Sequence, residues 1–184
     1  MNSGLIAQRY AKALMKYVKE THNEVLVYSQ VLSLIKSLYV IPQFRDAVER
    51  NPALSCEDRL GLMRTVLGED PCEDLVRFVH LVDSHSRMAF ISRIFIAFID
   101  KYHESRNIKV GTLVSAVQQD ELCARLEAMI SEQTGGTVDL TAKVDDSLIG
   151  GFVLQVGDLR MDASVSGQFK RIRNALIDND NRII

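Results

Sequence analysis

The chain has 184 residues, of which 47% are hydrophobic and 25% are charged, and its formal net charge is −2 at pH 7. This composition is typical of a soluble globular protein with one core of fair size or two small ones. A negative net charge argues against a nucleic-acid-binding protein, which needs a basic excess to displace counterions from phosphates. No stretch of about 20 apolar residues is present, so no helix is expected to span a membrane.

Three cysteines, Cys56, Cys72 and Cys123, are odd in number and lie far apart in the sequence. Their spacing favours structural thiols in a reducing compartment over a disulfide framework. The first residues are typical of a helix rather than of a signal peptide or an arginine-rich transit sequence. We therefore expect a cytoplasmic protein of bacterial origin.

The pattern of residues 1–105 is typical of consecutive helices with short breaks. The pairs Thr21/Glu24 and Ser55/Asp58 have the spacing of a helix-capping box, in which each side chain accepts from the other residue's backbone. Short links between six helices predict a compact six-helix bundle. The predicted helices cover residues 3–20, 22–40, 42–49, 55–67, 71–85 and 87–105.

From Asn107 onward the apolar residues alternate, which indicates strands. The pattern predicts a strand, a helix that ends at Gly135, three further strands and a last helix. Gly157-Asp158 between two alternating runs is typical of a type II′ hairpin, because glycine supplies the positive φ of that turn. The predicted core face of the last helix is Val165, Phe169, Ile172 and Leu176.

The predicted fold is therefore mainly α. An N-terminal six-helix bundle occupies residues 1–105, and a small α+β domain with about four strands and two helices occupies residues 106–184.

Two predicted helices carry more apolar surface than packing on one side requires. The apolar arc of helix 3–20 covers roughly 200°, whereas about 100° is enough for one-sided packing. Helix 71–85 shows the same excess. Either both helices are central in their own bundle, or together they form a groove for a helix of another chain, and the pattern leaves both open. The candidate groove residues are Ile6, Tyr10, Ala13, Leu14, Tyr17, Leu75, Val79 and Val82.

Two stretches of the sequence resemble the delta subunit of bacterial F-type ATP synthases, the counterpart of the mitochondrial oligomycin-sensitivity-conferring protein. One stretch is Ala7-Gln8-Arg9-Tyr10-Ala11-Lys12-Ala13-Leu14. The other is Val138-x-Leu140, Val144-Asp145 and Leu148-x-Gly150-Gly151-Phe152-x-Leu154-Gln155-x-Gly157. Ala163 and Ser166 depart from the usual form, in which glycine and a basic residue are common. The signature residues Gly150, Gly151, Gly157 and Asp158 are expected to be structural.

The resemblance implies a non-catalytic stator subunit of the F1 sector, present in one copy per complex, with no cofactor and no metal. It implies that residues 1–105 bind the N-terminal helix of a head alpha subunit through the first and fifth helices. It also implies that residues 106–184 bind the membrane-anchored b subunits of the peripheral stalk. Such a subunit holds the head against rotor torque during ATP synthesis and hydrogen-ion transport. It would lie peripherally at the cytoplasmic face of the bacterial inner membrane, without inserting into it.

An enzyme is the first alternative to a stator subunit. The sequence contains no Gly-x-Ser-x-Gly, no phosphate loop and no His-Glu-x-x-His motif. The Gly150-Gly151 pair leads into a strand, whereas phosphate binding uses a helix N-terminus. The spacings of His80, His85 and His103 do not place two metal ligands on one helix face. We therefore expect neither catalysis nor a metal site.

An RNA-binding helical-bundle protein is the alternative function. Lys170, Arg171 and Arg173 form a local basic cluster on the last helix. A solvated helix face explains the same cluster, and the resemblance suggests acidic residues of the stalk as its partners.

Overall fold

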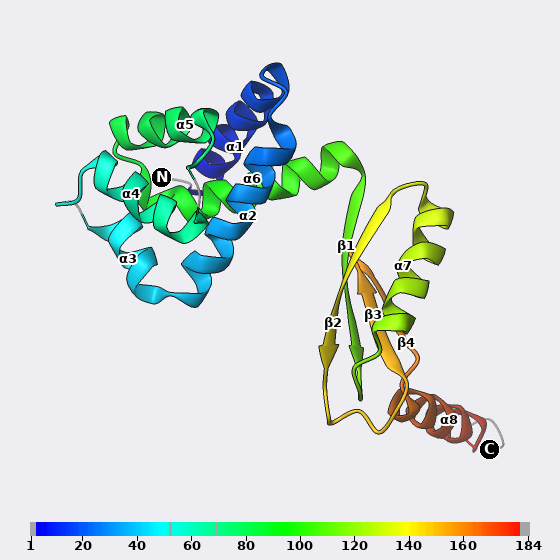
Figure 1. The fold of residues 1–184 in the computed structure, drawn as a ribbon. Coiled ribbons are helices and arrows are strands. Elements are labelled where there is room, and N and C mark those ends of the chain that lie inside the picture. The colour runs from blue at the N-terminus through cyan, green and yellow to red at the C-terminus, as the bar shows by residue number, and fades with distance from the viewer. Residues whose placement is uncertain (1–2, 52, 69, 181–184) are drawn as a thin grey trace. The chain divides into compact units, whose positions relative to one another are not determined.

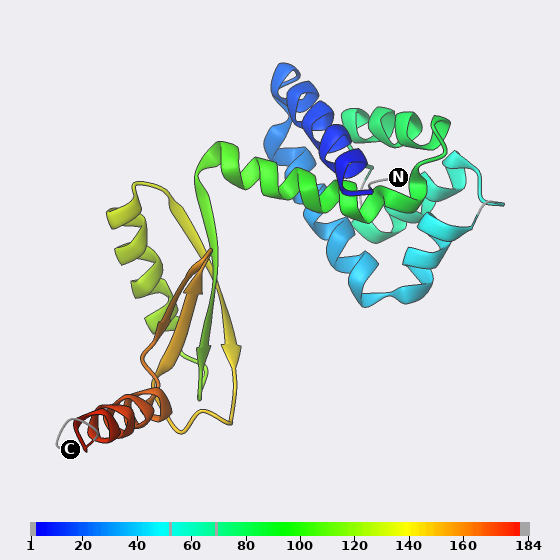
Figure 2. The ribbon, with the colours of Figure 1, turned by 180° about the vertical axis from the view of Figure 1, so that it is seen from behind.

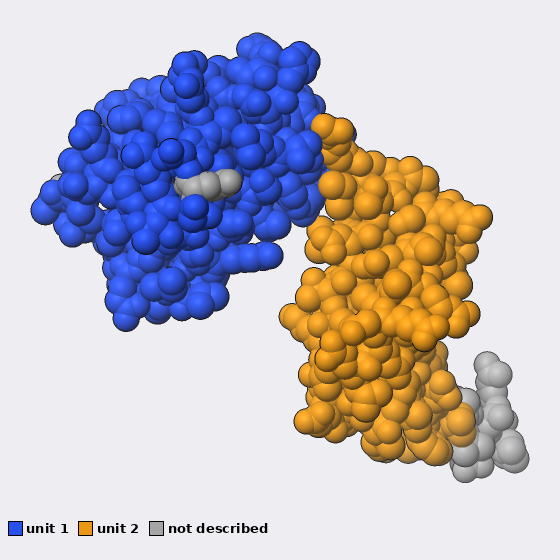
Figure 3. All heavy atoms as spheres, in the orientation of Figure 1, with its two compact units in different colours: residues 1–105 blue, residues 106–184 orange. Residues whose placement is uncertain are grey.

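The computed structural model describes residues 3–51, 53–68 and 70–180, with residue 3 and residues 174–180 described by their backbone alone (Figure 1). The chain forms two compact units, which Figure 3 colours separately. Unit 1 comprises residues 1–105 and unit 2 comprises residues 106–184. The described part is mainly helical, and its one sheet, of four strands, lies in unit 2.

The helices of unit 1 agree with the predicted ranges to within a few residues. The second helix begins at Glu24 rather than at residue 22, because His22 has a φ of 59°. The last helix of unit 1 begins at Ile91 rather than at residue 87, because a short 3-10 turn precedes it. The elements are α1 (Ser3–Glu20), α2 (Glu24–Val40), α3 (Pro42–Arg50), α4 (Cys56–Leu67), α5 (Glu73–Ser84), η1 (Met88–Phe90) and α6 (Ile91–Arg106).

Helix caps explain where some of these elements begin. The Ser55 hydroxyl accepts a hydrogen bond from the Asp58 backbone, and the Asp58 carboxylate accepts one from the Ser55 backbone, so the predicted capping box of α4 is confirmed. The predicted box of Thr21 and Glu24 is wrong. The N-cap of α2 is Asn23, whose side chain makes no capping bond, because both Thr21 and Asn23 donate to a carboxylate on α5 instead.

The core of unit 1 draws its largest set of fully buried side chains from α6. Ile91, Ile94, Phe95 and Phe98 on this helix are all 0% exposed. Burying one such side chain contributes about 1.5–3 kcal/mol to stability. α6 therefore contributes one buried face to the core of unit 1.

Unit 2 begins directly where α6 ends. α6 stops at Arg106, the first strand starts at Ile108, and Asn107 between them has a φ of 51°. This is the left-handed region, which asparagine adopts more readily than most residues. Gly136 lies against Asn107, since a Cβ atom on Gly136 would be 2.6 Å from the side-chain amide nitrogen of Asn107.

The sheet of unit 2 has the strand order β2-β1-β3-β4. β1 and β2 are parallel, and the pairs β1–β3 and β3–β4 are antiparallel. The predicted order of strands and helices is confirmed. The elements are β1 (Ile108–Ser115), α7 (Asp120–Thr134), β2 (Thr137–Val144), β3 (Phe152–Val156), β4 (Leu159–Asp162) and α8 (Val165–Asp180).

α7 connects the two parallel strands and packs on one face of the sheet (Figure 1). The small core of unit 2 is Leu113, Cys123, Val138, Leu140 and Leu154. These residues come from α7, β1, β2 and β3, whereas every residue of β4 is exposed. The cover that α7 gives to the sheet therefore does not extend to β4.

No single helix of the described residues has the length and hydropathy needed to cross a membrane. α2 and α3 would reach that length only as a pair, and they are bent by 109° at the break between them.

Candidate partner-binding surfaces

The structure places the eight predicted groove residues at very different depths. Five of them are buried in the core of unit 1: Tyr10, Leu14, Leu75, Val79 and Val82. Ile6 and Tyr17 are half-buried and Ala13 is exposed. The apolar excess of α1 and α5 thus serves mostly their own core, which corrects the interpretation of a wide vacant groove. An apolar arc on a helix does not say whether its cover comes from the same chain.

Tyr10 is held at the α1–α5 contact by both its ring and its hydroxyl. Its ring meets Phe78 of α5 edge-on, with 6.3 Å between ring centres. Arg87 donates a hydrogen bond of 2.6 Å to the Tyr10 hydroxyl, and its guanidinium carbon lies 5.3 Å from the ring centre. Both contacts stabilise a buried aromatic residue. Tyr10 therefore positions α1 rather than facing a partner.

Asp74 fixes the C-terminal end of α1 to α5. Its carboxylate accepts hydrogen bonds of 2.7 Å from both Thr21 and Asn23, and the residue is only 4% exposed. Burial raises the pKa of Asp74, but hydrogen bonds from Asn23, Thr21 and Tyr17 outweigh burial and lower the pKa below its ordinary value. The joint between the two helices is therefore closed by a carboxylate that is charged at neutral pH.

A smaller open face remains between α1 and α5. Arg77 of α5 donates a hydrogen bond of 3.2 Å to the Tyr17 hydroxyl of α1. One turn further along α5, Leu81 is 45% exposed. On α1, Ile6 and Ala13 share the helix face of Tyr17, since they precede it by eleven and four residues, or about three turns and one turn. These five residues are called the α1–α5 face below. Sequence reasoning missed Arg77 and Leu81, although Leu81 lies on the apolar arc of its helix.

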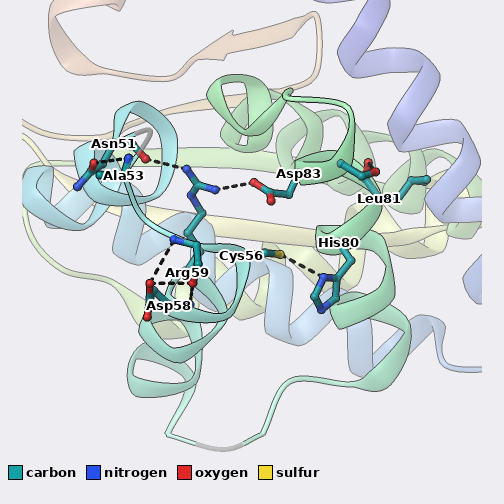
Figure 4. Close-up of polar contacts among 10 residues, drawn as sticks. Asn51, Ala53, Cys56, Asp58, Arg59, His80, Leu81 and Asp83 are labelled. Atoms are coloured by element: carbon teal, nitrogen blue, oxygen red, sulfur yellow. Dashed lines mark hydrogen bonds and ion pairs between the residues drawn. The ribbon is translucent and has the colours of Figure 1, made fainter.

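A second polar cluster anchors α5 to α4 and is shown in Figure 4. Arg59 donates to the Asp83 carboxylate at 2.5 Å and to the Asn51 carbonyl oxygen at 2.7 Å. The Arg59 side chain is 9% exposed, and its buried Nε has no hydrogen-bond partner. A buried guanidinium requires such partners, because an unpaired buried charge is costly. The cluster therefore fixes α5 to α4 and to the residue that follows α3.

Cys56 belongs to the same neighbourhood but has no sign of reactivity. Its sulfur lies 3.3 Å from Nδ1 of His80 (Figure 4). Burial and the nearby Asp83 carboxylate raise the pKa of the Cys56 thiol, which keeps it protonated at neutral pH. Within the described ranges, no group of three or more histidine, cysteine or acidic residues could hold a metal ion.

Gly150 and Gly151 lie at the start of β3, beside the start of α8, and Gly157 lies in the turn at the other end of β3. Gly151 has a φ of 78°, and a Cβ atom there would collide with the carbonyl oxygen of Ala163. Gly157 has a φ of 56°, and Asp158 is not among the positive-φ residues, as expected for a type II′ turn. Gly150 has no such strain, and a Cβ atom there would meet only Val165 at 3.3 Å. Gly151 and Gly157 therefore serve the backbone geometry of unit 2.

Unit 2 presents an apolar groove beside its hairpin. The groove has a volume of about 790 Å³ and lies between the C-terminal half of α7 and the β3–β4 hairpin. Ile130 of α7 and Leu154 and Val156 of β3 line it, together with Leu159 and Met161 of β4. Leu159 is 79% exposed and Met161 is 48% exposed. This groove is the part of the helix-covered sheet face that α7 leaves open.

α8 presents a second apolar surface, contrary to expectation. Phe169 is 66% exposed and Ile172 is 58% exposed, so the predicted core face of this helix is wrong. Only Val165 at its start is half-buried, and Leu176 lies outside the residues whose side chains the structure describes. Among the three cations of the basic cluster, Arg171 donates a hydrogen bond of 2.8 Å to the Asp162 carbonyl oxygen.

Comparison with known proteins decides what these surfaces belong to. Residues 6–176 match the family model described as ATP synthase delta (OSCP) subunit. The chain belongs to this family. Subunits of the family are structural parts of the peripheral stalk of a membrane-bound ATP synthase, and ion transport is the work of the whole complex. The RNA-binding alternative finds no support in this assignment.

Relatives in the delta (OSCP) family match along the whole chain. The chain is 37% identical to ATP synthase subunit delta of Phocaeicola vulgatus, with 100% of both chains covered. It is 33% identical to ATP synthase subunit delta of Bacteroides fragilis, again with 100% of both covered. Its fold is similar to a chain in the cryo-EM structure of the Toxoplasma gondii mitochondrial ATP synthase hexamer. That match has a TM-score of 0.68, 22% identity and coverage of 93% of this chain and 97% of the other.

Proposed function

We propose that this delta-family subunit links the catalytic head of an F-type ATP synthase to the b subunits of its peripheral stalk. The match over residues 6–176 carries the proposal. The chain has no catalytic role in it, since the link has only to resist rotor torque. Slow dissociation is the property such a link requires, and differences in affinity between related interfaces are mostly differences in off-rate.

Unit 1, as a six-helix bundle, binds the N-terminal helix of an alpha subunit in this proposal. The binding surface is the α1–α5 face, whose five residues are half-buried or exposed. The five buried candidates act from beneath by holding the two helices in place. A fixed backbone favours affinity, because less conformational freedom is lost when the partner binds.

Unit 2 binds the b subunits through its two uncovered apolar surfaces. The groove beside the β3–β4 hairpin and the α8 face with Phe169 and Ile172 are both open in the free chain. Exposed apolar area of this kind marks interaction sites. The basic residues beside the α8 face would meet acidic residues of the stalk.

One copy of the chain then lies peripherally at the cytoplasmic face of the bacterial inner membrane. The bacterial relatives of similar length support this location.

Calorimetry with a synthetic alpha-subunit N-terminal peptide tests the assignment of unit 1. Leu81→Asp and Ala13→Asp in the full chain should weaken binding at least about tenfold, because each places a charge in the apolar contact. Lys36→Asp on α2 is the control. Tyr10→Asp and Val79→Asp are unsuitable probes, because a carboxylate at these buried positions would unfold unit 1. Unchanged peptide binding by both face variants would contradict the assignment.

A pull-down from detergent-solubilised membranes tests the assignment of unit 2. The double variant Phe169→Asp/Ile172→Asp should lose the b subunits and keep the alpha subunit. Loss of the alpha subunit alone would reverse the roles of the two units. Nucleotide turnover by the purified chain would contradict a purely structural role.

A further inference from the structure

A seam between α1 and α6 forms a second surface on unit 1, away from the α1–α5 face. Two open cavities of about 250 Å³ and about 240 Å³ lie along it, in the same order along both helices. Figures 1 and 2 both draw α1 beside α6. From Gly4 to Lys19 the seam follows α1 for about 22 Å at 1.5 Å per residue. That length accommodates four turns of a helix from another chain.

The floor of the seam is apolar and its rims are charged. Ala7 and Met15 of α1 and Ala97 of α6 line the floor, and each is less than 9% exposed. The small alanine side chains keep the floor low, so a docking segment can approach the helix backbones. The rims carry five cations and two carboxylates, which gives a net charge of +3 in a chain whose total is −2. These seven residues are Lys12, Lys16, Lys19, Arg93, Lys101, Asp100 and Glu104.

Most of the positive charge in the second cavity is not neutralised within the chain. Lys16 lies 3.9 Å from Glu20, with both side chains more than half exposed. Lys12, Lys19 and Lys101 form no ion pair with another described residue. Like charges held around one cavity repel each other, and a partner carboxylate relieves this repulsion. The second cavity therefore selects for negative charge.

We propose that the α1–α6 seam docks an acidic amphipathic segment of a partner protein. The apolar side of the segment covers Ala7, Met15 and Ala97, and its carboxylates meet the lysines on the rims. The apolar floor favours a peptide over a nucleic acid, because a nucleic-acid backbone is charged along its whole length. The seam is distinct from the α1–α5 face and does not depend on the function proposed for that face.

The test uses the full chain and a designed helical peptide of about 16 residues, with leucines along one side and glutamates flanking them. A second peptide with glutamine in place of every glutamate is the control. We expect the glutamate peptide to bind at low salt and to lose at least about tenfold in affinity at 300 mM salt, where surface charges are screened. Equal binding of the glutamine peptide would overturn the proposal.

Charge reversal locates the peptide on the chain. The double variant Lys12→Glu/Lys19→Glu should weaken the glutamate peptide at least about tenfold, and Lys101→Glu should weaken it from the α6 side. Lys36→Glu, on α2 and outside the seam, is the matched control and should bind like the unaltered chain. Of the four lysines changed in the three variants, Lys12, Lys19 and Lys36 are exposed and Lys101 is half-buried, so unchanged melting temperatures verify the fold. Unaltered binding by both seam variants would overturn the proposal.

Two further measurements test whether the seam is a site separate from the α1–α5 face and whether a second copy of this chain occupies it. Leu81→Asp, on the α1–α5 face, should bind the glutamate peptide normally even where it loses the alpha-subunit peptide. Sedimentation of the free chain should show a monomer. A dimer that the seam variants dissociate would assign the seam to a second copy of this chain and overturn the proposal.

Discussion

The carboxylate of Asp74 on α5 accepts a hydrogen bond of 2.7 Å from the hydroxyl of Thr21, which directly follows α1. Asn23 donates to the same oxygen, so one buried side chain joins the α1–α2 turn to α5. α1 and α5 are the two helices of the proposed alpha-subunit site. The geometry of that site therefore depends on a residue that does not take part in it.

Asp74→Ala should lower the free energy of unfolding of unit 1 by about 1–3 kcal/mol, because two donors lose their acceptor in a buried place. Urea denaturation followed by circular dichroism measures the change. Asp46→Ala is the control, since Asp46 forms an exposed pair with Arg50 and should alter stability by less than about 0.5 kcal/mol. Equal effects of the two substitutions would contradict the role given to Asp74.

Stability should also depend on pH through Asp74. Hydrogen bonds lower the pKa of Asp74 in the folded chain, so the unfolded chain binds the proton more tightly. The stabilisation is therefore complete above the ordinary aspartate pKa of about 3.9 and is lost as the pH falls through the lower, folded value. Asp74→Asn should show a smaller loss of stability between neutral and acidic pH than the unaltered chain. Parallel stability curves for the two proteins would refute this prediction.

Gly151→Ala should destabilise unit 2 by about 2–4 kcal/mol, since alanine is strained at positive φ and its methyl group would collide with Ala163. Gly157→Ala should cost about 1–2 kcal/mol, because φ is positive there but the space is open. Gly61→Ala, within α4 and with no atom near its Cβ position, should stabilise by about 0.5–1 kcal/mol. Thermal melts that rank the three variants differently would argue against a purely geometric role of the signature glycines.

Asp83→Ala should destabilise unit 1 by about 2–3 kcal/mol, because the buried guanidinium of Arg59 loses its charged partner. This loss is smaller than the roughly 3–5 kcal/mol typical of a fully buried pair, since the Asp83 side chain is 28% exposed and water can replace it in part. Asp70→Ala breaks the exposed pair with Arg64 and should change stability by less than about 0.5 kcal/mol. Chemical denaturation of both variants provides the comparison.

Phe169→Asp and Ile172→Asp should leave the melting temperature of the free chain within about 2 °C of its original value, because both side chains are exposed. The same substitutions at core positions of a helix would unfold it. A large drop in melting temperature would mean that α8 packs against the unit in solution and would remove it as an open docking surface.

Local chemistry made much of the fold predictable. The breaks between helices, the Ser55–Asp58 capping box and the Gly157-Asp158 turn each depend on a few neighbouring residues. The alternation of Val138 and Leu140 placed these residues on the covered sheet face, where both are buried. Of the strand pairs, only the β3–β4 hairpin followed from turn geometry.

Burial was less predictable, because it depends on which distant element covers a face. The apolar arc that includes Tyr10 and Val79 is covered by the chain's own helices, whereas the equally apolar face of Phe169 and Ile172 is not. Thr21 has the right spacing for a cap, but its hydroxyl donates to a carboxylate 53 residues away, and α2 begins at Glu24 after Asn23. The pattern of apolar and capping residues within one helix does not identify such long-range partners.

The direct passage of α6 into β1 through Asn107 has a mechanical consequence. A linker of many residues behaves as an entropic spring that extends under load before it transmits force. A single connecting residue spans about 3.5 Å and has almost no contour length to release. Tension along the backbone therefore reaches the sheet as soon as it is applied to the helix. Beyond rotation about this residue, further extension under load must come from deformation of packed structure.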